Sequence, residues 1–172
     1  MKYKIIILCI LVLVLLSPVA SACSYHMGSN EHAVKLKKIH WYGSTTYSNE
    51  WSAAVSTWNG MGSVTIKADH LLSQKDLKIL DVDSPRPYGY TGDWPSAGYS
   101  NGSENGTKHI KINTAILYGY SSNERTKTLT HELGHALGIK DINIDNNIMR
   151  QGRLSQTSLG TKDKEVYRCI WG

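Results

Sequence analysis

Apolar and polar positions first mark out a strand followed by a helix. Residues 38–42 are rich in β-prone side chains and predict a strand. After a polar turn, Ser48 is placed to cap a helix, which Gly60 would end. The apolar residues between them recur at helical spacing, and they are Trp51, Ala54, Val55 and Trp58. This stripe predicts a helix face that is buried in a core.

Three further segments have the pattern of strands. Residues 64–67 and 109–113 alternate apolar and polar side chains, whereas 77–83 is a less regular apolar stretch. Residues 84–107 contain three prolines and several glycines, which predicts a long irregular loop or short edge strands. We expect one such edge strand near 97–101.

A second helix is predicted between Ser121 and Gly138. Ser121 and Glu124 have the spacing of a capping box, and Gly138 supplies a C-terminal stop. The apolar residues Leu129, Leu133, Ala136 and Leu137 form one face of this helix. Residues 161–171 predict a closing helix, with Asp163 and Glu165 in its first turn, where acidic groups complement the helix dipole.

The length of the chain and the pattern at its N-terminus predict a signal peptide followed by one domain. Lys2 and Lys4 precede an apolar run that ends near Leu16, and small residues follow at 20–22, so residues 1–22 are predicted to be a secretory signal peptide. A membrane anchor is the alternative, but this run is shorter than the roughly 20 residues that span a bilayer. The remaining residues, 23–172, are enough for a single domain, which we expect to be secreted and monomeric.

The net charge and the cysteines bear on the partners of the protein and on a disulfide bond. The formal charge of +5 falls to +3 without Lys2 and Lys4, and no basic cluster interleaved with aromatic residues indicates nucleic acid as a partner. Cys23 and Cys169 remain near the ends of the chain, and in an oxidising compartment they predict a disulfide. Cys23 can instead be a lipid acceptor, which would hold the protein at the cell surface.

The predicted helix 121–138 contains a metal-binding pattern. His131-Glu132-Leu133-Gly134-His135 is an HExxH sequence, and its four-residue spacing puts both imidazoles on one helix face. Glu132 lies on the adjacent flank, where it can hold a water molecule rather than the metal. Zinc lowers the pKa of bound water to about 7, so Glu132 is the expected general base of a hydrolase.

These residues resemble the metzincin superfamily of zinc peptidases, and within it the matrixin-like and snapalysin-like branches. His131, Glu132, His135 and Gly138 match the pattern HExxHxxGxxH, while Asp141 stands where most members have the third histidine. The resemblance implies that one zinc ion is bound by His131, His135 and Asp141, and that Met149 forms the methionine turn beneath it. It also implies an α/β fold with a twisted mixed sheet, an active-site helix, a backing helix and a C-terminal helix.

One departure and one alternative ligand limit what the resemblance implies. The tyrosine that usually follows the methionine turn is replaced by Arg150, so the specificity pocket does not transfer. Glu165 is an alternative third ligand, as in families where a later helix completes the site. His26, His32, His40, His70 and His109 have no ligand spacing and are expected at the surface or in the core.

The function that these features favour is a secreted zinc endopeptidase acting on protein or peptide substrates. The competing interpretation is a secreted binding or effector protein that zinc merely stabilises. Glu132 argues against this alternative, because a structural zinc site needs only ligands and usually has four.

Overall fold

A five-stranded mixed sheet forms one layer of the computed structural model, which describes residues 32–70, 74–83, 98–104 and 106–172. The strands lie in the order β2-β1-β3-β5-β4. Four of them are parallel, and β4 at the edge runs antiparallel to β5. Their bounds are Lys38–Gly43 for β1, Thr65–Ala68 for β2, Leu77–Val82 for β3, Gly98–Glu104 for β4 and Thr107–Asn113 for β5.

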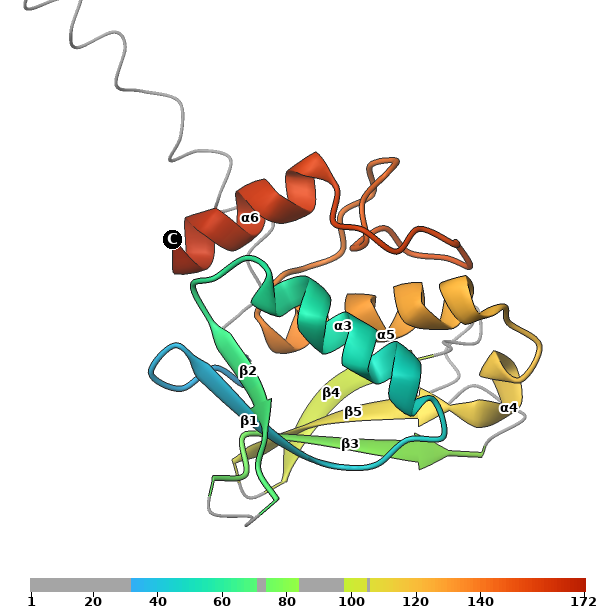
Figure 1. Ribbon diagram of the computed structural model, residues 1–172, viewed down its shortest axis with the longest axis horizontal. Coiled ribbons are helices and arrows are strands. Elements are labelled where there is room, and N and C mark those ends of the chain that lie inside the picture. Colours follow the sequence, from blue (N-terminus) through green and yellow to red (C-terminus); the bar gives the residue numbers. More distant parts are fainter. Residues whose placement is uncertain (1–31, 71–73, 84–97, 105) are drawn as a thin grey trace, which may run out of the picture.

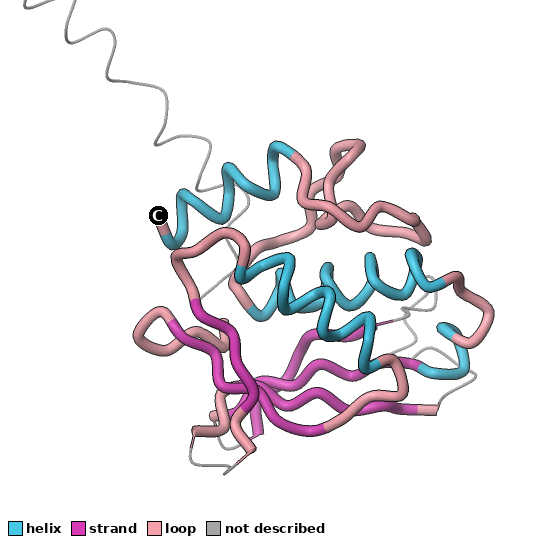
Figure 2. Tube along the Cα trace, in the orientation of Figure 1, coloured by secondary structure: helices cyan, strands magenta, loops and turns pink. Residues whose placement is uncertain are grey.

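Four helices belong to the described part of the chain. They are α3 (Ser48–Asn59), α4 (Thr114–Leu117), α5 (Ser122–Ala136) and α6 (Thr161–Trp171). Helices α3 and α5 lie side by side over the same face of the sheet, and α6 lies beyond them (Figure 1). A long segment without helix or named strand connects α5 to α6 (Figure 2). The mixed α/β class expected from the sequence is therefore confirmed.

The core fills the space between the helices and the sheet. Ile39, Leu77, Ile79, Ile110 and Ile112 of the strands are fully buried, as are Trp58 of α3 and Leu129 and Leu133 of α5. Trp58 stacks on Tyr167 of α6 with ring centroids 5.8 Å apart, and its indole donates to Thr130 O at 2.8 Å. The aromatic stripe on α3 is thus largely a core feature, and it ties α3 to both other long helices.

Several element boundaries match the sequence patterns, and some differ. The capping box of Ser121 and Glu124 is present, and α6 has the predicted bounds. Ser48 is the first residue of α3 and not its cap, because the N-cap position belongs to Tyr47, whose side chain makes no capping hydrogen bond. Tyr47 is buried, so packing rather than capping fixes this helix start. The short helix α4 was not predicted.

The irregular segment expected at 84–107 is partly an edge strand. Residues 98–104 form β4, in agreement with the edge strand expected near 97–101, whereas 84–97 lie outside the described residues. The predicted signal peptide at 1–22 and Cys23 also lie outside them. Cys169 is in α6, and its pairing with Cys23 stays a prediction. Among the described helices, none has the length and apolar character needed to cross a membrane.

Candidate metal centre

Helix α5 carries the three residues of the HExxH pattern, with His131 and His135 on one face and Glu132 on the adjacent flank. His131 and Glu132 are buried, with exposed fractions of 8% and 6%, and His135 is half-buried four residues later. The helix begins at a satisfied capping box, so its first turn is well fixed. Consequently the helix, and not a mobile loop, positions the imidazoles.

Three ligand atoms from His131, His135 and Asp141 converge on one point. The two Nε2 atoms lie 3.1 Å apart, and Asp141 Oδ1 lies 3.1 Å from His131 Nε2 and 3.3 Å from His135 Nε2. An ion with tetrahedral ligands at roughly 2.0 to 2.2 Å requires ligand atoms about 3.3 to 3.6 Å apart. The observed triangle is close to one face of such a tetrahedron, so this group can hold a metal ion.

The other ring nitrogen of each histidine fixes its tautomer. His131 Nδ1 lies 2.9 Å from Ile148 O, and His135 Nδ1 lies 2.8 Å from Ile139 O. A carbonyl oxygen can only accept, so both Nδ1 atoms must carry hydrogen. In the neutral rings, both Nε2 atoms then direct lone pairs at each other and at a carboxylate. A positive charge among these atoms, either a metal ion or a proton on one ring, makes that arrangement favourable.

The pKa shifts of Asp141 and His135 also indicate that the cluster favours a positive charge. Burial opposes ionisation of Asp141, but hydrogen bonds with His131 and His135 hold its pKa well below the ordinary value. Burial disfavours charge on His135 as well, yet Asp141 and Glu132 raise the pKa of its imidazole. The carboxylates therefore stabilise positive charge at this position, whether it is a proton or a metal ion.

The chain leaves α5 through Gly138 and returns to the histidines at Asp141. Gly138 has φ +84°, a backbone conformation that residues with a side chain rarely adopt. Asp141 Oδ2 accepts a hydrogen bond of 2.7 Å from Gln151 Nε2, which orients the carboxylate so that Oδ1 faces the imidazoles. Sequence reasoning missed Gln151, because ten residues separate it from Asp141 and no local pattern links them.

Met149 packs against α5, where Gly134 makes room for it, and its role as a methionine turn stays a prediction. A Cβ added to Gly134 would lie 2.3 Å from Met149 Sδ and 3.0 Å from Trp58 Cζ2. Met149 is fully buried. Its neighbour Ile148 provides the carbonyl that orients His131, so this turn supports the centre directly.

Helix α6 stabilises the turn at Met149 through hydrogen bonds. Asp163 is fully buried and accepts hydrogen bonds from the backbone N–H groups of Ile148, Met149 and Gly160. Asn147 accepts in turn from the backbone N–H groups of residues 162 and 163 at the start of α6. Asp163 was expected only to complement the helix dipole, and its burial in the fold gives it this larger role.

A buried lysine lies one helical turn before His131. Lys127 is 2% exposed, and its Nζ donates to the carbonyls of Arg150 and Gly152. Burial lowers the pKa of Lys127 to about 8, although Glu132, Asp141 and Asp163 oppose this shift. Lys127 thus links α5 to the segment after Met149. Its i, i+4 spacing from His131 is the sequence signal that could have identified it.

Glu132 lies against the edge strand β4. A Cβ added to Gly98 would be 2.6 Å from Glu132 Cγ and 2.9 Å from Oε1. The strand therefore approaches the carboxylate as closely as a glycine allows. Glu132 is not part of the ligand triangle, and its role beside a metal stays a prediction.

Other candidate residues lie apart from the ligand triangle. Glu165, the alternative ligand, is exposed and pairs with Lys162 at 3.0 Å. Arg150 pairs with Asp145 at 2.6 Å. His40 is buried with its Nδ1 2.9 Å from Asp76, which agrees with the packing role expected for it. His26 lies outside the described residues.

Comparisons with known proteins bear on the fold. No protein-family model matches the chain, and no curated protein matches it. Solved structures do match, among them a chain of the structure described as "GM1 bound form of the ECX AB5 holotoxin". This match has a TM-score of 0.56 and 15% sequence identity, and it covers 90% of each chain. At this level of identity, the likeness concerns the fold alone.

Proposed function

We propose that this chain is a secreted zinc-dependent endopeptidase of the metzincin type, with Glu132 as its general base. The observation that carries the proposal is the convergence of two Nε2 atoms and one carboxylate oxygen within 3.3 Å, with Glu132 beside them on the same helix. Catalytic zinc sites typically have three protein ligands and an open fourth position, whereas structural sites have four.

The donor set fits zinc in particular. Two imidazoles and one carboxylate are ordinary zinc ligands, and both imidazoles have the second hydrogen bond that such ligands usually make. Zinc at this position would polarise a substrate carbonyl and lower the pKa of a water molecule. The exchange of an imidazole for Asp141 reduces the net charge of the site, so we expect that water to be less acidic than with three histidines.

Glu132 is suited to move the proton in this reaction. Its carboxylate takes a proton from the attacking water and returns it to the leaving amine. Burial and the contact with Gly98 leave this side chain little freedom, which favours a fixed proton acceptor.

Strand β4 offers a way to align the substrate. It is the last strand of the described sheet on the side of Glu132, and an extended peptide can pair with such an edge by main-chain hydrogen bonds. A peptide paired with β4 near Gly98 would pass next to the general base. Protein or peptide substrates therefore suit this site.

The direct test is zinc analysis and a casein-cleavage assay on the secreted protein and on Glu132→Gln. We expect about one zinc per chain in both proteins, and a rate at least about a hundredfold lower in the variant, because general acid–base catalysis contributes about that much or more. Glu165→Gln is the matched control and should keep both zinc and activity. A Glu132→Gln variant that cleaves casein at a sizeable fraction of the original rate would contradict the assignment of the base.

The same assay separates the proposal from its alternative. Stoichiometric zinc together with no cleavage of any protein substrate by the unaltered chain would favour a secreted binding or effector protein that zinc stabilises. A lipid adduct on Cys23 in mass analysis would place the protein at the cell surface.

A further inference from the structure

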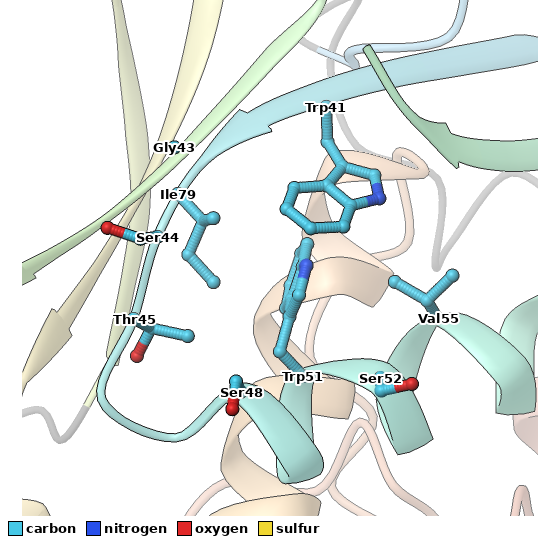
Figure 3. A pocket seen from close by; sticks show the side chains of 9 residues that line it. All are labelled: Trp41, Gly43, Ser44, Thr45, Ser48, Trp51, Ser52, Val55 and Ile79. Atoms are coloured by element: carbon cyan, nitrogen blue, oxygen red, sulfur yellow. The ribbon is translucent and has the colours of Figure 1, made fainter. Parts of the chain in front are cut away.

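Strand β1 links a pocket at one end of the strand to an exposed turn at the other. The pocket has a volume of about 330 Å³ and lies between β1, β3 and α3 (Figure 3). Its walls include the indoles of Trp41 and Trp51, and no lining residue is charged. The turn at residues 35–38, which leads into β1, instead combines one leucine with three lysines. Of these two features, the turn therefore offers the charged groups that can select a partner.

Residues 35–38 form a tight hairpin whose tip is in an unusual backbone conformation. The N–H groups of Lys35 and Lys38 each donate to the carbonyl of the other residue, at 2.8 and 2.9 Å. Between them, Leu36 and Lys37 have φ values of +50° and +58°. Two successive positive φ values are typical of a type I′ turn, which favours asparagine and glycine and strains bulky residues. Among the described residues, the only other non-glycine residue with positive φ is Asn146, which tolerates it.

The strained tip places an apolar side chain in solvent. Leu36 is 95% exposed, whereas Ile144, another exposed aliphatic residue, is 49% exposed. The turn is the blue loop that projects beyond the start of β1 (Figure 1). Because a strained residue persists only where something else favours it, Leu36 at this position indicates a use for its side chain. A projecting tip can use that side chain by inserting it into a yielding or hollowed surface.

Positive charge surrounds the apolar tip. Lys35, Lys37 and Lys38 are exposed, and the sequence has no acidic residue from position 32 to 49. Lys35 Nζ lies 3.0 Å from Asp76 Oδ1, so this carboxylate compensates part of the charge. Lys37 Nζ donates to a main-chain carbonyl at the end of α6 at 3.0 Å, and this neutral partner leaves its charge in place. Within the part of the chain that the structure describes, no acidic group pairs with Lys38. The turn therefore presents net positive charge beside Leu36.

We propose that residues 35–38 dock this protein onto a membrane surface with anionic lipid headgroups, into which Leu36 inserts. An apolar side chain enters the boundary between headgroups and acyl chains, while lysines beside it attract the anionic headgroups. The apolar stems of the lysines can lie along the same boundary with their charges in water. A protein partner fits less well, because a stable protein interface buries roughly 800 Å² on each side, which a two-residue tip does not supply. The docking is weak and reversible, and it needs neither the metal centre nor a lipid on Cys23.

Sedimentation with lipid vesicles tests this docking on the secreted protein. Vesicles of phosphatidylserine and phosphatidylcholine in equal parts should bind the protein saturably, and added salt should weaken the binding. Vesicles of phosphatidylcholine alone should bind little of it. Lys38→Gln should weaken binding about fivefold, because one lysine near an anionic surface contributes about that factor. No saturable binding to the anionic vesicles, or equal binding to both kinds of vesicle, would overturn the proposal.

Leu36→Asn separates docking from folding, because it should affect the two in opposite directions. Asparagine suits the positive φ of the turn, so the free energy of unfolding in urea should stay the same or rise. Vesicle binding should nevertheless fall about tenfold, since the inserted side chain is lost while every charge remains. Equal binding of Leu36→Asn and the unaltered chain would mean that charge alone acts, as on an acidic protein, and would refute the insertion.

Two control variants locate the contact on the turn. Ile144→Asn makes the same kind of change at another exposed aliphatic residue and should leave vesicle binding unchanged. Ser52 is exposed and lines the pocket, so Ser52→Leu should obstruct the pocket and also leave binding unchanged. A loss of binding in Ser52→Leu as large as that in Leu36→Asn would place the lipid in the pocket and would overturn docking by the turn.

Discussion

Gly98→Ala tests the position of the proposed general base, Glu132, with the smallest possible side chain. The added Cβ would lie 2.6 Å from Glu132 Cγ, whereas ordinary contacts begin at 3.4 Å, so one group must move by about 0.8 Å. Strand β4 is hydrogen-bonded to β5 on one side, and the glutamate side chain is the softer of the two. A displacement of about 1 Å at a reacting group can reduce the rate about a hundredfold. We therefore expect kcat to fall about a hundredfold.

The variant should lose activity without losing structure or metal. Alanine in a strand is more favourable than glycine by roughly 0.5 to 1 kcal/mol, so the free energy of unfolding should fall little or not at all. The assay is kcat and KM on a quenched peptide substrate, together with zinc content. Gly119→Ala is the control, because nothing lies within 4 Å of its added Cβ. If Gly98→Ala cleaves within a few-fold of the original rate, Glu132 does not act from the position described above.

Three further predictions concern the metal ligands, the support beneath them and the buried lysine. Asp141→Ala should lose most bound zinc in metal analysis, whereas Asp145→Ala, on the same connection, should keep it. Gly134→Ala should lower the free energy of unfolding by about 1 to 3 kcal/mol in urea, although alanine normally stabilises a helix, because its Cβ overlaps Met149 Sδ. The pKa of Lys127 is about 8 when folded and near 10.5 when unfolded, so the unfolded chain binds more protons and stability rises by about 3 kcal/mol between these pH values. Lys127→Met should abolish that rise in urea unfolding at pH 8 and 10.

Local sequence patterns were sufficient to predict those features that residues close together in the chain determine. The capping box and the apolar face predicted α5, and Gly138 correctly ended it. The HExxH spacing brought two imidazoles together because helix geometry alone fixes their separation. Asp141 meets them through the turn at Gly138, which is also a local feature.

Features that depend on distant parts of the chain were not visible in the sequence. The strand order β2-β1-β3-β5-β4 arises from packing between segments far apart, and no local period encodes it. The start of α3 is set by burial of Tyr47 and not by a capping side chain at Ser48. Asp163 was expected only to complement the dipole of the closing helix, because its partners at 148 and 149 become neighbours only after folding.

Because α6 fastens the turn at Met149 through Asp163, an ion bound by His131, His135 and Asp141 acts as a cross-link between two halves of the fold. Two ligands belong to α5 and the third to the connection that α6 holds, so metal affinity and the folding of the C-terminal half are one coupled equilibrium. Free zinc at a thousand times its Kd would add about 4 kcal/mol to the stability of the whole chain. For the secreted zinc enzyme proposed above, scarcity of zinc would therefore lower the stability of the fold as well as the activity.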